Sequence, residues 1–258
     1  MRHYSGTSSG TTTIVVEPPS NSEVRPSAGT ITNVTSTATT ITLVGSEIEH
    51  ATFYEFAIKL ESTTYYHTDD SSTYTYRSLI QDSSTSLNPG TEYTVNYRGM
   101  NASNDGRYTT GQTIWTLPED PIIISATATS KSAIKVTWSP SAGATEYSFY
   151  YVASGTSSGT RESSVSYTTN SNGTLSYTIT GLSEKVLYHI YLYSYNANGD
   201  VCANEAYTTS TTQSDAAGYA YIYSGGWQKA TPYVWTGSSW TKVIPYIYAS
   251  GSWKKTGE

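Results

Sequence analysis

The chain has 258 residues and a formal charge of −6 at pH 7. Only 13% of its residues are charged, against about 25% in an average globular domain. Ser and Thr make up about a third of the chain, and Tyr occurs 25 times. These residue types disfavour helices and suit pleated sheets, so the composition predicts an all-β protein and excludes helix bundles and Rossmann enzymes.

Charge and cysteine content narrow the class further. No basic stripe is present, so we expect no nucleic-acid partner. The single cysteine, Cys202, leaves no intrachain disulfide framework. No apolar run reaches the about 18 residues of a membrane-spanning helix, and the first residues lack an apolar signal region. We therefore expect synthesis in the cytosol and no membrane insertion.

Residues 1–24 are rich in Ser, Thr, Gly and Pro and are expected to form an N-terminal arm. A partner would order such an arm, or it is a floppy terminus. Residues 25–117 contain short alternating apolar runs, such as 39–44 with Ile41 and Leu43 on one face. A hairpin turn is expected at Asn104-Asp105-Gly106. This spacing is typical of a β-sandwich.

Residues 118–213 repeat the same plan. Residues 133–138 place Ile134, Val136 and Trp138 on one face of a strand, and Asn198-Gly199-Asp200 is expected to turn. The two halves align on one another: Leu87 precedes Tyr93 by six residues, as Leu182 precedes Tyr188.

The run Leu87-Asn88-Pro89-Gly90-Thr91-Glu92-Tyr93 resembles the fibronectin type III signature before strand F. The resemblance implies that Tyr93 and Tyr188 are tyrosine corners with their hydroxyls tied to backbone. It also implies that Trp138 is the strand-B core tryptophan, with Leu43 in its place in the first half. In the second half Glu184 stands where Pro is expected, so that match depends on Leu182 and Tyr188. The resemblance implies two tandem sandwiches.

Residues 214–258 form three copies of an aromatic unit whose tryptophans, Trp227, Trp240 and Trp253, recur every 13 residues. Each copy is expected to form a strand, a Gly/Ser turn and a second strand, because aromatic cross-strand pairs stabilise such ribbons. The candidate binding patch is built from the aromatic residues of these copies: Tyr221, Trp227, Tyr233, Trp235, Trp240, Tyr246 and Trp253. Three interpretations of these rings remain open: they stack on sugars, they dock a protein, or they only form the core of a small module.

The sequence shows no catalytic or metal-binding motif and no cofactor fingerprint. Residues 155–159, Gly-Thr-Ser-Ser-Gly, are expected in a loop rather than at a nucleophile elbow. The histidines lack metal-ligand spacing, and residues 67–70 are interpreted as a solvated loop rather than a cation site. His189 is expected on a strand surface, and Cys202 is expected to pack on the last strand of its domain. We therefore expect neither an enzyme nor a cofactor.

The aromatic repeats resemble the C-terminal repeats of tail and other virion proteins of bacteriophages. This resemblance implies a virion structural protein, in a decoration, fibre or tail position, that is made in the host cytoplasm and exposed on the particle. Its expected partners are other virion proteins, host-surface glycans and further copies of itself. Two alternatives remain: a bacterial cell-surface or secreted carbohydrate-binding accessory module, and a tail-tube or baseplate component.

Overall fold

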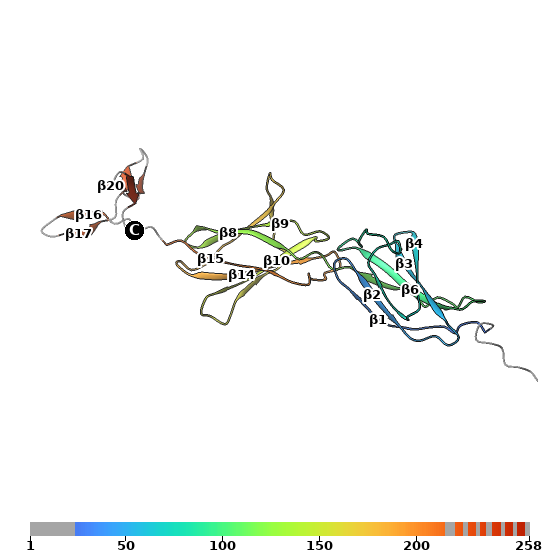
Figure 1. Cartoon of the computed structure of the whole chain (residues 1–258). Coiled ribbons are helices and arrows are strands. Elements are labelled where there is room, and N and C mark those ends of the chain that lie inside the picture. Colours follow the sequence, from blue (N-terminus) through green and yellow to red (C-terminus); the bar gives the residue numbers. More distant parts are fainter. Residues whose placement is uncertain are drawn as a thin grey trace, which may run out of the picture. The chain divides into compact units, whose positions relative to one another are not determined.

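The computed structural model describes residues 24–214 and the segments 220–223, 227–230, 233–235, 239–243, 246–249 and 252–255. Every regular element in these residues is a β-strand (Figure 1), which confirms the predicted all-β class for the described part of the chain. Within that part, no helix is long and apolar enough to cross a membrane. The expected N-terminal arm lies outside the described residues except for Val24.

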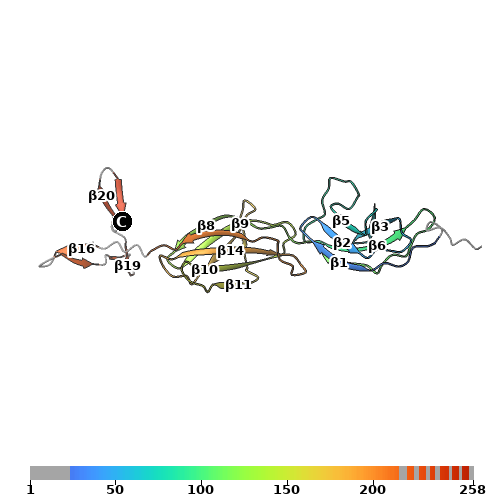
Figure 2. The ribbon, with the colours of Figure 1, turned by 60° about the horizontal axis from the view of Figure 1, so that its bottom comes forward.

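The first sandwich pairs a three-stranded sheet with a four-stranded one, both antiparallel (Figure 2). The smaller sheet has the order β1-β2-β5, with β1 at Ile31–Ser36, β2 at Ile41–Gly45 and β5 at Thr73–Tyr76. The larger sheet has the order β4-β3-β6-β7, with β3 at Phe53–Leu60, β4 at Thr63–Asp69, β6 at Glu92–Met100 and β7 at Gln112–Trp115.

Alternating side chains of both sheets fill the core of this sandwich. Ile41 and Leu43 of β2 are both fully buried, as their spacing predicts. From the opposite sheet, Phe56 stacks on Tyr97 with ring centroids 5.7 Å apart. The Tyr97 hydroxyl lies 3.0 Å from the Thr30 carbonyl oxygen and donates a hydrogen bond to it. A phenol therefore links β6 to the start of the opposite sheet.

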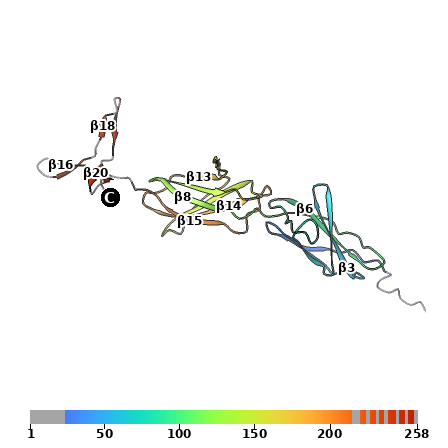
Figure 3. The ribbon, with the colours of Figure 1, turned by 45° about the horizontal axis from the view of Figure 1, so that its top comes forward.

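The second sandwich has two four-stranded antiparallel sheets (Figure 3). One has the order β12-β13-β9-β8, with β8 at Ile122–Ser130, β9 at Ala133–Ser139, β12 at Thr168–Thr169 and β13 at Leu175–Ile179. The other has the order β11-β10-β14-β15, with β10 at Glu146–Ala153, β11 at Thr160–Glu162, β14 at Leu187–Tyr195 and β15 at Ala206–Thr211. The latter sheet repeats the strand order of β4-β3-β6-β7, so the internal repeat seen in the sequence is also a repeat of topology.

Trp138 of β9 is the centre of the second core. Its side chain is fully buried, and its ring meets the edges of Tyr147 and Phe149 at centroid distances of 5.4 Å each. Ile134 and Val136 of the same strand are also fully buried, as their alternation predicts. The buried Trp138 Nε1 has no hydrogen-bond partner among the described residues.

Three local expectations are corrected by the structure. The expected Asn104–Gly106 turn is displaced, because the Asn101 side chain accepts hydrogen bonds from the backbone amides of residues 103 and 104 and closes the turn there. Cys202 is buried in the loop before β15 rather than on that strand. His67 lies on β4 and is 1% exposed, so it is not part of a solvated loop.

The described C-terminal segments form three separate two-stranded antiparallel sheets (Figure 1). Their strands are β16 at Ala220–Tyr223, β17 at Trp227–Ala230, β18 at Tyr233–Trp235, β19 at Trp240–Lys242, β20 at Tyr246–Ala249 and β21 at Ser252–Lys255. Each of the three sequence copies thus forms one ribbon, with its strands on either side of the Gly/Ser segment.

Candidate functional site

The backbone register of the three C-terminal ribbons repeats with the sequence. In every ribbon a Tyr is the cross-strand partner of a Lys, as Tyr233 is of Lys242. In every ribbon a second aromatic residue is the partner of the Trp, as Trp235 is of Trp240. The equivalent pairs are Tyr221 with Lys229, Tyr223 with Trp227, Tyr246 with Lys255 and Tyr248 with Trp253. The same two cross-strand pairs, a Tyr with a Lys and an aromatic residue with a Trp, therefore occur three times along the chain.

Among the candidate patch residues, the structure describes the side chains of two. Trp240 is 67% exposed and Tyr233 is 53% exposed. The side chains of Tyr221, Trp227, Trp235, Tyr246 and Trp253 lie outside the described residues, although their backbone belongs to the ribbons. The described members are thus large aromatic rings in contact with solvent.

The residues expected to be structural lie in the two sandwich cores. The Tyr93 hydroxyl accepts a hydrogen bond from the Asn88 amide at 3.0 Å, and the Tyr188 hydroxyl accepts one from the Ser183 amide at 3.0 Å. Leu87 and Leu182, six residues before each tyrosine, are both buried. Burial raises the pKa of the Tyr93 phenol, which keeps it neutral as a hydrogen-bonding group.

An outward-facing aromatic cluster covers part of the β10-β14-β15 sheet and was not identified from the sequence. We call Tyr150, His189, Tyr191 and Tyr207 the tyrosine face. Tyr191 lies 5.1 Å from Tyr207 and 5.9 Å from Tyr150 between ring centroids. His189 stacks on Tyr207, and its Nδ1 is hydrogen-bonded to the Tyr207 hydroxyl at 2.7 Å.

The tyrosine face combines exposure with hydroxyl-tipped rings. Tyr207 is 53% exposed, and the other three members are half-buried. The period-two run of His189, Tyr191 and Tyr193 on one strand was the signal for this cluster in the sequence. Its pairing with Tyr207 required the β14–β15 register, in which Tyr191 and Tyr207 are cross-strand partners.

The corresponding sheet of the first sandwich carries a charged network instead. The Arg98 guanidinium contacts Glu55 at 2.7 Å and lies 4.7 Å above the Tyr108 ring. The Tyr108 hydroxyl donates a hydrogen bond to the same Glu55 carboxylate. Burial and then this hydrogen bond raise the pKa of Tyr108. These groups satisfy one another, so they do not form an open binding face like that of the second sandwich.

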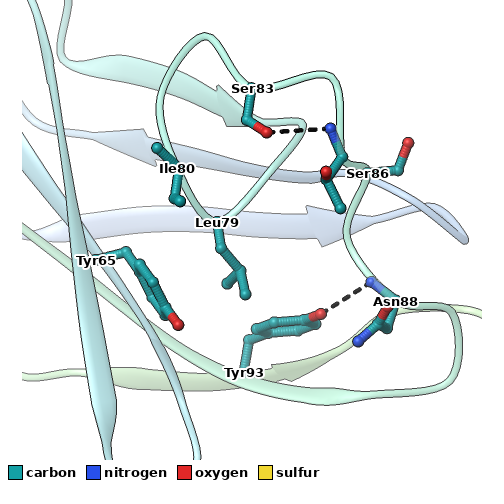
Figure 4. Close-up of a pocket in the computed structure, with 8 residues that line it drawn as sticks. Tyr65, Leu79, Ile80, Ser83, Ser86, Asn88 and Tyr93 are labelled. Carbon is teal, nitrogen blue, oxygen red and sulfur yellow. Dashed lines mark hydrogen bonds between the residues drawn. The ribbon is translucent and has the colours of Figure 1, made fainter.

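A cavity of about 200 Å³ lies beneath the loop between β5 and β6 in the first sandwich (Figure 4). Its walls include Tyr65 of β4, Leu79 and Ile80 of the loop, and Tyr93 of β6. Ser86 and Asn88 lie on its rim. The sequence did not indicate this cavity, because its residues come from separate strands and a loop.

Metal-ligating side chains are scattered within the described residues. No group of three or more His, Cys, Asp or Glu side chains within them is placed to hold a metal ion. The hydrogen bond from the Tyr177 hydroxyl to Glu162 raises the pKa of Tyr177 to about 12, so this phenol stays protonated near neutral pH.

Comparison with known proteins gives a match within the second sandwich. Residues 118–211 match the family model of the Fibronectin type III domain. No curated protein matches the chain.

Solved structures that resemble the chain include a two fibronectin type-III domain segment from chicken tenascin, at 17% identity and a TM-score of 0.49, with 73% of this chain and all of that one covered. Another is the FN1–FN3 segment of chicken CNTN1, at 19% identity and a TM-score of 0.32, with 72% of this chain and 64% of that one covered.

Proposed function

We propose that the protein is a structural component of a bacteriophage virion that displays two fibronectin type III-like sandwiches and adheres weakly to glycans of the host surface. It acts without catalysis and without a cofactor. It is made in the host cytoplasm, is exposed on the particle as a decoration, fibre or tail-associated protein, and is present there in several copies. Its partners are other virion proteins and surface glycans.

The observation that carries the proposal is the threefold repetition of one aromatic ribbon after the two sandwiches. Exposed rings such as Trp240, and the tyrosine face of the second sandwich, provide apolar surfaces with polar edges, which suit the faces of sugar rings. Several weak sites on one particle raise the overall affinity by about 10²–10⁴-fold if they engage together. The resemblance of the repeats to those of phage virion proteins supports a particle as the place where they act.

The location is tested by replacing the protein in assembled particles with a chain that lacks residues 215–258. These residues carry a net charge of +2, whereas the rest of the chain carries −8, so this segment is a candidate for docking on the particle. Loss of the truncated chain from purified particles would support docking through the ribbons. Unchanged incorporation would exclude it and point to the N-terminal arm. Absence of the full-length protein from particles would overturn the virion role.

Adhesion is tested separately with glycan arrays and two double variants of the full chain. Trp235→Ala with Trp240→Ala removes two rings of one ribbon, and Tyr191→Ala with Tyr207→Ala removes two rings of the tyrosine face. Tyr66→Ala is the matched control, since Tyr66 is 56% exposed on the first sandwich. We expect the double variants to bind the glycans of the array more weakly than the unchanged chain does, and the control variant to bind them equally well.

The alternatives make different predictions for the same protein. A carbohydrate-binding accessory module would bind glycans as a monomer and would be absent from particles. A tail-tube or baseplate component would form ring-shaped oligomers, which size-exclusion chromatography and electron microscopy detect.

A further inference from the structure

We propose that the cavity between Tyr65, Leu79 and Tyr93 binds a single neutral sugar ring, such as the terminal unit of a glycan. This inference deepens the proposed adhesive function by assigning a second kind of glycan site, and it rests on that function only for the biological source of the sugar. The site belongs to the first sandwich and uses none of the aromatic residues of the ribbons or of the tyrosine face.

The volume of the cavity limits the size of the ligand. At about 200 Å³ it is smaller than the roughly 300–1,000 Å³ of sites for drug-sized molecules. A single six-membered ring is the unit that this space favours, and the remainder of a longer glycan would extend into solvent. Ile80 on the cavity wall is 64% exposed, so the entrance opens to solvent.

The loop that covers the cavity is held in place before any ligand arrives. The carbonyl oxygen of Leu79 is hydrogen-bonded to Nε2 of the buried His67 at 2.9 Å. Gln81 accepts a hydrogen bond from the Thr68 amide at 2.9 Å and donates one to the Thr68 carbonyl at 3.0 Å. The Asn88 amide donates to the Tyr93 hydroxyl in the floor (Figure 4). A preformed site loses less conformational entropy on binding, which matters most for a small ligand with few contacts.

The chemistry of the walls matches the two kinds of surface on a sugar. Figure 4 shows Leu79 pointing between the rings of Tyr65 and Tyr93, which makes one side apolar and suited to the C–H face of a pyranose. On the rim, the side chain of Asn88 makes no hydrogen bond to other described residues. The Tyr65 hydroxyl is also unbonded within the described residues. These donors and acceptors are available to sugar hydroxyls.

The lining also indicates that the ligand is uncharged. None of the residues that line the cavity is Asp, Glu, Lys, Arg or His. A charged ligand would lose hydration there without gaining an opposite charge, which is unfavourable. A neutral sugar is therefore favoured over a sugar acid or an amino sugar. An apolar side chain of a protein partner is the competing occupant, and the experiment distinguishes it.

The test is a titration of the full-length isotope-labelled chain with neutral monosaccharides at millimolar concentrations, followed by NMR. Glucose, galactose and N-acetylglucosamine are the neutral probes, and glucuronate and glucosamine are the charged ones. We expect saturable shifts of the amides of residues 65, 79–88 and 93 with at least one neutral sugar and none with the charged probes. A short Leu- and Phe-containing peptide is titrated in parallel.

Two variants establish that the shifts come from the cavity. Asn88→Ala removes a rim side chain without touching the backbone amide that holds Tyr93, and we expect it to weaken binding by about three- to tenfold, the effect of one lost hydrogen bond. Ser86→Trp places a bulky ring on the exposed rim and is expected to abolish the shifts. Tyr66→Ala, next to Tyr65 on the same strand but on its other face, is the control that should leave binding unchanged. Melting temperatures show whether each variant is folded.

The inference is overturned if no neutral sugar shifts these amides, if Ser86→Trp binds as well as the wild type, or if only the peptide binds. Because the titration uses the isolated chain, its failure leaves the particle location untouched. If the protein is absent from particles, the virion role is overturned, but sugar binding measured in this cavity still holds.

Discussion

At the scale of the residue, the hydrogen-bond partners and the burial of His67 determine where its proton lies and how readily it titrates. Its Nε2 is hydrogen-bonded to the Leu79 carbonyl, so Nε2 carries the proton and Nδ1, 3.0 Å from the Tyr74 hydroxyl, accepts. Burial lowers the pKa of His67 below its ordinary value of 6.5, partly offset by the Leu79 hydrogen bond and by Asp82. The neutral ring thus anchors the loop above the cavity.

This histidine predicts a loss of stability in mild acid. The folded state disfavours the protonated ring, so the unfolded chain takes up a proton first as the pH falls below 6.5. The contribution is fully present above that pH and decreases below it. We expect the free energy of unfolding, from urea denaturation, to fall between about pH 7 and pH 5.

His67→Gln is the matched variant, since its amide keeps one donor and one acceptor but does not titrate. It should be less sensitive to pH over that range. An identical pH slope in the wild type and in His67→Gln would contradict the assignment.

At the scale of the element, the same tyrosine-corner hydrogen bond occurs in both sandwiches. Tyr93 on β6 and Tyr188 on β14 each accept a backbone hydrogen bond from five residues upstream. Their hydroxyls fasten the incoming loop to a central strand. The equivalence follows from equal spacing in the sequence and equal strand order in the structure.

Removing either hydroxyl should cost similar stability. Tyr93→Phe leaves the Asn88 amide without its partner, and Tyr188→Phe does the same to the Ser183 amide. Each change is expected to destabilise its own domain by about 1–3 kcal/mol, the cost of an unsatisfied, partly buried donor. Chemical denaturation of each variant measures this. The Tyr65 hydroxyl makes no hydrogen bond to other described residues, so Tyr65→Phe should change the free energy of unfolding little. Equal effects of all three substitutions would argue against the corner as the cause.

At the scale of the whole molecule, the chain divides into two compact units, one made mostly of the first sandwich and the other mostly of the second. Each has its own buried core, one around Leu43, Phe56 and Tyr97 and the other around Trp138 and Phe149. Because the two cores are separate, we expect the two sandwiches to unfold in separate transitions.

Trp138→Ala tests this independence. Loss of this fully buried side chain is expected to cost about 3–5 kcal/mol, a large part of the roughly 5–15 kcal/mol that stabilises a typical domain. Differential scanning calorimetry should show one transition lowered and the other unchanged. Leu43→Ala should lower the other transition instead. A single transition that moves as a whole in both variants would show that the sandwiches unfold together.

The sequence alone determined the class and the core, because both depend on local patterns. Alternation placed Ile41, Leu43, Ile134, Val136 and Trp138 inside, since strand side chains point to opposite faces in turn. Equal spacing identified the paired tyrosines, and a 13-residue period identified the three ribbons. These features need no knowledge of which strands become neighbours.

Only the tertiary structure decided the surfaces where binding is proposed. The tyrosine face needs β10, β14 and β15 side by side, and the cavity needs Tyr65, Leu79 and Tyr93 brought together from two strands and a loop. The same applies to His67, whose burial depends on the loop that folds over it. Such sites arise from contacts between residues far apart in the chain, whereas composition and periodicity report only on neighbours along it.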